Sequence, residues 1–155
     1  MKKHTHDAIA LLRATRKNIL GIYNNHNFDQ LNSVPAGFNN NLIWNAGHVI
    51  ATMELLTYGM ARLPLPSGQE FVNRYRKGSR PAPPSPDGDY ALIGEGLSKS
   101  IDRLVSDLDT LDFSNFKEYT TSYGVTLTCI EDALTFNNMH EALHLGTMMA
   151  FKRLV

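Results

Sequence analysis

The chain has 155 residues, of which 43% are hydrophobic, and its 15 Lys and Arg balance its 15 Asp and Glu. The length fits one domain over residues 1–155, and the composition is globular rather than disordered. Zero net charge, with no basic run, argues against nucleic-acid and membrane-surface partners, because both require a concentrated positive surface. The single Cys129, the lack of an apolar span and the lack of a signal-peptide pattern after MKKHTHD together predict a cytoplasmic protein.

Two amphipathic segments occupy the first part of the chain. The first runs from about Asp7 to Asn25, and the second from about Asn39 to Gly59. Pro64 and Pro66 follow the second segment and prevent the helix from continuing. The residues of the first segment at helical spacing are Ile9, Leu12, Arg16, Ile19, Leu20 and Tyr23.

The stretch from Pro64 to Asp89 is rich in Pro, Gly and Ser, and its end reads PAPPSPDGD. It predicts a long ordered crossover with one short helical turn around Glu70 to Tyr75. Connections of this length are commonly functional or cover a site.

A third amphipathic segment runs from about Tyr90 to Leu108, with Asp89 as its predicted N-cap. A fourth starts near Thr126 and continues to the C-terminus. Four such segments with a long crossover between the second and third, and no alternating strand pattern, predict an all-α four-helix bundle.

Aromatic residues between Phe113 and Tyr123 show no clear periodicity. We expect this stretch and the Pro-rich crossover to cover the open end of the bundle and shape the mouth of a substrate site. A dimer contact is the alternative for the aromatic stretch, because exposed aromatic residues mark interfaces.

His140 and His144 are the most informative residues, because histidines four apart project from the same face of a helix. They fall on the arc of the fourth segment that is predicted to face the interior. Two neutral imidazoles side by side need several polar partners, and one metal ion would satisfy both. The pair therefore predicts a metal site.

The second segment supplies the third ligand, His48. Asn41, Asn45, His48 and Thr52 form a polar seam at spacings of four, three and four on an otherwise apolar helix. We expect Asn41 or Asn45 to line the pocket or to orient His48, since ligating histidines usually have such a partner. Thr52 and Asn137 are further candidates for the pocket.

HEALH also matches the zinc-protease pattern HExxH, in which Glu141 would be the general base. The protease interpretation fails because residues 145–155 hold no Glu, Asp or His to act as a downstream ligand. Glu141 remains a candidate auxiliary base. The alternative is that Glu141 is a partly exposed residue of the helix with a structural role only. We expect His4, His6 and His26 to be solvated.

This arrangement resembles the DinB-like superfamily, also called DinB/YfiT. The matching pieces are NLIWNAGHV around His48 and NNMHEALHLGTM around His140 and His144. Helix order and the long crossover also agree, so the resemblance covers nearly the whole chain. It implies that the three histidines coordinate one divalent ion, with the remaining positions open to water or substrate.

The resemblance also bears on function. Superfamily members include thiol-dependent S-transferases and a maleylpyruvate isomerase that use low-molecular-weight thiols, and dimers are common among them. We therefore expect a homodimeric, metal-dependent enzyme acting on a small molecule, of thiol S-transferase or hydrolase type. The ion would be Zn, Ni, Fe or Mn, because imidazole accepts each, and its open position should favour an anion. The alternative is a non-catalytic bundle with a structural metal or a partner-binding role.

Overall fold

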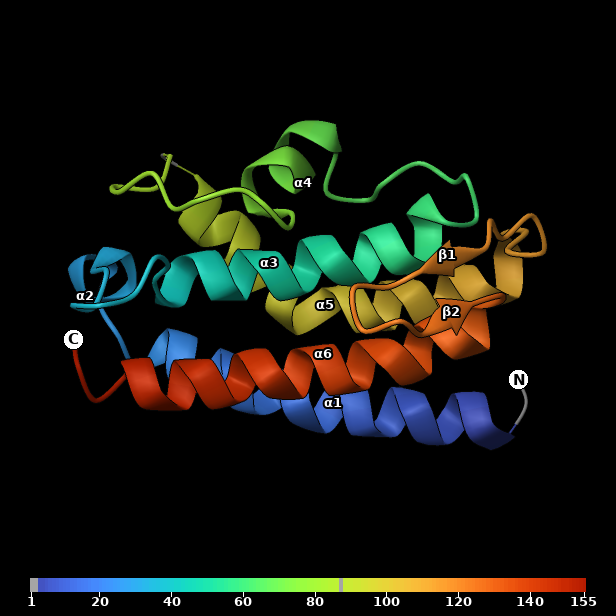
Figure 1. Ribbon diagram of the computed structural model, residues 1–155, viewed down its shortest axis with the longest axis horizontal. Helices are drawn as coiled ribbons and strands as arrows, with labels where there is room; N and C mark the ends of the chain where they lie inside the picture. Colours follow the sequence, from blue (N-terminus) through green and yellow to red (C-terminus); the bar gives the residue numbers. More distant parts are fainter. Residues whose placement is uncertain (1–2, 87) are drawn as a thin grey trace.

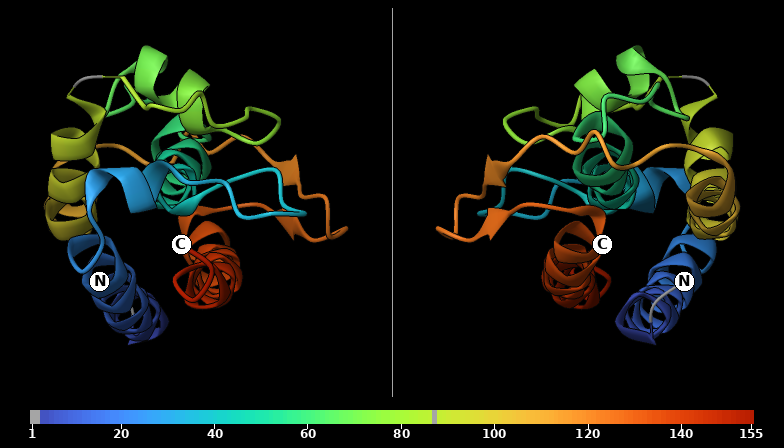
Figure 2. Two further views of the ribbon diagram at one scale, coloured as in Figure 1. Left: turned by 90° about the vertical axis from the view of Figure 1, so that its left-hand side faces the viewer. Right: turned by 90° about the vertical axis from the view of Figure 1, so that its right-hand side faces the viewer.

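Four long helices form the body of the protein (Figure 1). The computed structural model describes residues 3–86 and 88–155. The long helices are α1 (Lys3–Asn24), α3 (Leu42–Glu54), α5 (Asp89–Thr110) and α6 (Ile130–Phe151). Helices α1 and α3 each pack against both α5 and α6, which closes the bundle seen end-on in Figure 2. The predicted all-α four-helix bundle is confirmed.

Shorter elements decorate this bundle. They are α2 (Phe28–Asn32), the π-helix η1 (Leu55–Gly59), α4 (Gln69–Tyr75), β1 (Tyr119–Thr120) and β2 (Thr126–Leu127). The crossover between α3 and α5 contains α4, as predicted, and α4 packs on α3. The antiparallel hairpin β1–β2 lies beside the end of α3 and the start of α6 (Figure 1). None of the described helices is long and apolar enough to cross a bilayer.

Two predicted helix starts need correction. Asp89 is the first residue of α5 rather than its N-cap, which is Gly88. The Asp89 carboxylate instead accepts hydrogen bonds from Arg74 and from the Tyr75 hydroxyl, so it ties α4 to α5. The fourth helix starts at Ile130 and not near Thr126, because Thr126 pairs with Thr120 in the hairpin.

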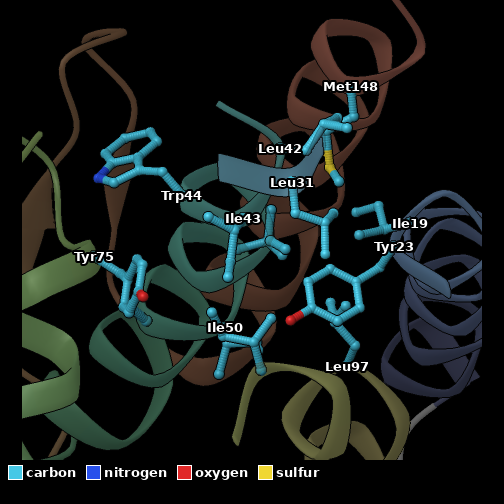
Figure 3. Close-up of a cluster of buried hydrophobic side chains, with 14 of the residues drawn as sticks. Ile19, Tyr23, Leu31, Leu42, Ile43, Trp44, Ile50, Tyr75, Leu97 and Met148 are labelled. Atoms are coloured by element: carbon cyan, nitrogen blue, oxygen red, sulfur yellow. The ribbon is translucent and has the colours of Figure 1, made fainter. Parts of the chain in front are cut away.

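The core lies between the four long helices (Figure 3). Ile19, Ile43, Ile50, Leu97 and Met148 come from all four of them and are buried to within 2%. Fully burying a side chain of this size contributes roughly 1.5–3 kcal/mol, so the apolar stripes supply most of the drive for assembly.

A glycine allows α4 to approach α3 closely. A Cβ on Gly47 would lie 2.5 Å from Cδ1 of Tyr75, which is nearer than such atoms can pack. Only glycine therefore permits the Tyr75 ring to lie against the backbone of α3 at this point. The contact places the end of α4 directly over the helix that carries His48.

Candidate metal centre

Three histidines from two helices converge on one side of the bundle. His48 comes from α3, and His140 and His144 come from successive turns of α6. One nitrogen of each lies within 4.8 Å of the others, and the Nε2 atoms of His48 and His140 are 3.1 Å apart. No fourth His, Cys, Asp or Glu of the described residues joins this group. The cluster can hold a metal ion, as the sequence predicts.

The Nδ1 atoms of two of these histidines are held by hydrogen-bond acceptors. Nδ1 of His48 lies 2.6 Å from the Tyr75 carbonyl oxygen. Nδ1 of His144 lies 2.8 Å from Oδ1 of Asn45. A carbonyl oxygen can only accept, so both Nδ1 atoms carry the proton and both Nε2 atoms keep a free lone pair.

The amide orientation of Asn45 follows from its other partners. Its Nδ2 donates to Oδ1 of Asn40 at 2.9 Å and to the Asn41 carbonyl at 2.7 Å. Since Nδ2 has two acceptors, the atom facing His144 is the amide oxygen. Asn45 is fully buried, and its side chain therefore fixes both the tautomer and the direction of the His144 ring.

Burial holds all three imidazoles in the neutral form that binds metal. Burial is the main cause that lowers the pKa of His140 to about 2, and the charges of His144 and His48 lower it further. Burial, followed by the neighbouring His48, lowers the pKa of His144 to about 3. Burial also lowers the pKa of His48, although its hydrogen bond to the Tyr75 carbonyl opposes the shift.

The chemistry of these donors fits a divalent ion. The two Nε2 atoms of His48 and His140 face each other at 3.1 Å, and nitrogens bound to one zinc ion at ~2.0–2.1 Å stand roughly this far apart. The other ring nitrogen of His140, Nδ1, is buried without a protein partner. Trp44 stacks on the face of the His48 imidazole with ring centroids 4.6 Å apart. This contact restricts the orientation of the His48 ring in addition to the hydrogen bond at Nδ1.

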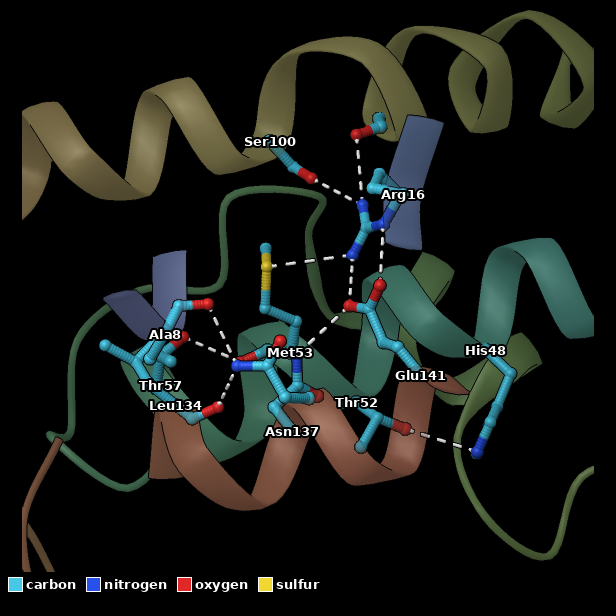
Figure 4. Close-up of polar contacts among 12 residues, drawn as sticks. Ala8, Arg16, His48, Thr52, Met53, Thr57, Ser100, Leu134, Asn137 and Glu141 are labelled. Carbon is cyan, nitrogen blue, oxygen red and sulfur yellow. Dashed lines mark hydrogen bonds and ion pairs between the residues drawn. The ribbon is translucent and has the colours of Figure 1, made fainter. Parts of the chain in front are cut away.

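A cavity of about 240 Å³ opens beside the histidines, and His48 and His140 form part of its wall. Thr52, half-buried, also lines it, and its hydroxyl lies 3.3 Å from Nε2 of His48 (Figure 4). The hairpin region contributes residues 119 and 121–123, and Lys77 comes from the crossover. Parts of both stretches expected at the mouth of the site therefore border it, whereas Phe113 is buried against Tyr58 instead.

The three asparagines that were predicted to line the pocket make different contacts. Asn45 is an orienting residue, but its partner is His144 and not His48. Asn41 is the N-cap of α3: its Oδ1 accepts from the Trp44 amide at 2.9 Å, and its Nδ2 donates to the Asn32 carbonyl. Asn137 donates to Glu141 rather than to a histidine. Thus only Asn45 of these three contacts the cluster.

Glu141 points into the bundle interior, toward α1 (Figure 4). Its carboxylate accepts from Nε and Nη2 of Arg16 at 3.0 and 2.5 Å, and from Nδ2 of Asn137 at 3.0 Å. Glu141 is fully buried, so the alternative interpretation of a partly exposed helix residue is wrong. Arg16 also donates to Ser100 Oγ at 2.9 Å, and the network therefore joins α1, α5 and α6.

Sequence reasoning missed two residues that hold the site. Tyr75 orients His48 through its backbone carbonyl, which leaves no signature in a side-chain pattern; Gly47 beneath it was the available signal. Arg16 pairs with Glu141, and its place on the apolar stripe of the first helix could have indicated a buried acidic partner. His4 and His6 are exposed as expected, while His26 is half-buried and bonds the Ile22 carbonyl.

Comparison with known proteins gives the affiliation of the chain. Comparison with curated proteins finds no match. The family model described as the DinB superfamily matches residues 11–148, which include all of α3 and α5, most of α1 and α6, and the three histidines. The chain belongs to the DinB superfamily.

Proposed function

We propose that the protein is a metal-dependent enzyme acting on a small molecule, of thiol S-transferase or hydrolase type, with one divalent ion held by His48, His140 and His144. One observation carries this proposal: the ligand cluster forms part of the wall of a cavity. Three protein ligands beside an open space are typical of a catalytic site, whereas structural sites are closed by a fourth ligand.

The chain's own residues supply orientation and a shielded space. The Tyr75 carbonyl and Asn45 hold the rings of His48 and His144, and the apolar wall of the cavity would cover part of a bound substrate from water. The Thr52 hydroxyl can hydrogen-bond a substrate atom next to His48. A divalent ion bound here would act as a Lewis acid that lowers the pKa of a coordinated thiol or water. A low-molecular-weight thiol as co-substrate is part of the proposal, supported by the superfamily resemblance.

A homodimer in the cytoplasm completes the proposal. Met139, Leu143 and Met149 on the outer face of α6 are 41%, 49% and 50% exposed. Apolar side chains gathered on one exposed helix face are typical of contacts between copies. The single cysteine is consistent with a reducing compartment.

The positions of the ligands on α3 and α6 support a second candidate, in which the ion crosslinks the two helices without catalysis. Both candidates require that the purified protein bind about one divalent ion per chain. The triple variant His48→Ala, His140→Ala, His144→Ala should stay folded and lose the ion, whereas His26→Ala, outside the cluster, should keep it. Equal metal retention by the triple variant would show that the ligand assignment is wrong.

Activity distinguishes the two candidates. The metal-loaded protein is screened with thiols plus electrophilic acceptors and with hydrolysable esters and amides. We expect turnover that depends on the metal and is lost in His144→Ala. Turnover that survives metal removal or this substitution would contradict the catalytic proposal, and no turnover with any acceptor would favour the crosslinking ion.

A further inference from the structure

We infer that this site takes a small anionic molecule with a compact apolar body, with the anionic group directed to the histidines and the body enclosed by the cavity. The inference rests on the proposed function, since it names the substrate class of the same site. Its basis is the size, the lining and the charge of the cavity.

The cavity wall is mainly hydrocarbon. Its apolar and aromatic lining consists of Leu55, Leu56, Met60, Tyr119, Tyr123 and Phe136. The volume is about 240 Å³, and an apolar cavity of roughly 150 Å³ is enough to bind benzene. The space therefore fits one aromatic ring with a short chain, and burial of such a body against this wall is favourable.

Two irregular elements contribute to the lining of this space. The π-helix η1 supplies Leu55 and Leu56, and its π-type bond from the Met60 amide to the Leu55 carbonyl measures 3.0 Å. Insertions of this kind in helices are frequent at functional sites. The hairpin supplies Tyr123, which meets Phe136 of α6 edge to face, with centroids 6.0 Å apart. An aromatic or branched body would pack against both groups.

The charge of the lining selects an anion. Among the residues that the structure describes, Lys77 is the only Lys, Arg, Asp or Glu that lines the cavity, and it is exposed to solvent. The two histidines in the wall carry no negative charge, and a divalent ion bound by them would add positive charge with no carboxylate to balance it. An acid would meet two positive groups, whereas an amine of the same shape would be repelled by both.

Calorimetric binding to the zinc-loaded protein tests this inference with three probes: acetate, 4-phenylbutyrate and 4-phenylbutylamine. Each buried methylene should strengthen binding about fourfold. We therefore expect 4-phenylbutyrate to bind at least about 100-fold more tightly than acetate, and the amine to bind more weakly than the acid by a comparable factor. Equal affinities for acetate and 4-phenylbutyrate would overturn the inference, as would an amine that binds as well as the acid.

Variants of the wall separate the body from the anionic group. Tyr123→Ala and Phe136→Ala should each weaken 4-phenylbutyrate binding about tenfold and leave acetate unchanged. Tyr123 is 60% exposed, so its removal does not disturb the core. Lys77→Gln should weaken both acids by a similar factor, and Lys17→Gln, away from this cavity, should weaken neither. Wall variants that bind 4-phenylbutyrate like the wild type would refute the placement of the body.

The metal content of each sample and a titration of metal-stripped protein keep this test separate from the proposed function. Protein that retains no ion at the histidines contradicts the proposed function. The cavity wall and Lys77 remain in that sample, so the inference still requires the preference for 4-phenylbutyrate over acetate and its reduction by about tenfold in Phe136→Ala. If neither the zinc-loaded nor the metal-stripped protein prefers 4-phenylbutyrate over acetate, the inference is overturned. This holds even if the histidines bind the ion and the proposed function stands.

Discussion

The ion pair between Arg16 and Glu141 allows a quantitative test of what Glu141 does. Arg16 and Glu141 are 2% and 0% exposed, and two hydrogen bonds join them. Replacing Glu141 with Gln leaves the Arg16 charge buried without its partner, which typically costs about 3–5 kcal/mol. Glu54 lies within electrostatic reach of Arg16 and compensates in part, so we expect about 3 kcal/mol.

The assays are urea and thermal unfolding of the wild type and Glu141→Gln. For a chain of this size, 1 kcal/mol corresponds to roughly 2–4 °C in Tm, so 3 kcal/mol predicts a decrease of about 6–12 °C. The matched control is Glu95→Gln, which removes an exposed pair with Lys99 and should change stability by less than about 0.5 kcal/mol. The variant should still bind one metal ion per chain, because Glu141 is not part of the histidine cluster.

A double variant shows whether the cost comes from the unpaired charge. Arg16→Met combined with Glu141→Leu removes both charges and retains most of the volume, so it should recover most of the lost stability. The reasoning is refuted if Glu141→Gln is as stable as the wild type but loses metal or activity. That result would place Glu141 in the chemistry of the site, as the HExxH pattern suggests.

Three further predictions follow from the structure. Gly47→Ala should push Tyr75 away from α3 and destabilise the fold by about 1–3 kcal/mol in unfolding experiments. Because the Tyr75 carbonyl then no longer holds His48, metal affinity should fall about 10–100-fold in competition with a chelator. Unchanged metal affinity would argue against this role of the Tyr75 carbonyl. Burial raises the pKa of Glu54, so the wild type loses stability as the pH rises from the ordinary pKa of a glutamate through the raised one. Glu54→Gln does not ionise, so it should gain stability relative to the wild type in urea unfolding as the pH rises from about 4 to 8. A difference that falls with pH would contradict this sign. Leu143→Glu should convert the proposed dimer to a monomer in sedimentation experiments, and a wild-type monomer would remove the dimer proposal.

The long helices could be predicted from the sequence because their stability comes from apolar stripes that repeat at helical spacing. The spacing also identified His140 and His144 as neighbours, since residues four apart meet on any α-helix. His48 required one more argument, the polar seam on an apolar helix. Each of these signals lies within a single helix, and the structure confirms that the three histidines they indicate lie together in one cluster.

The partners of these residues could not be predicted, because they depend on how the elements pack. Asn45 lies on the same seam as His48, yet its amide reaches across to His144 on α6. The Tyr75 carbonyl contacts His48 only because α4 rests on Gly47. The strand β2, which begins at Thr126, could not be predicted for a different reason: strands of two residues each are too short to show an alternating pattern.

The adjacent residues His140 and Glu141 show how one helix serves two environments. Neighbours on an α-helix point about 100° apart, so His140 can face the cavity while Glu141 faces α1. Arg16 fixes the rotation of α6 about its own axis through two hydrogen bonds to Glu141, and it is itself held by Ser100. A rotation that released Glu141 from Arg16 would also move His140 away from His48. The buried ion pair and the metal cluster therefore require the same orientation of α6. Glu141, the acidic residue of HEALH, thus has a structural role next to the ligands, although it is not itself a ligand.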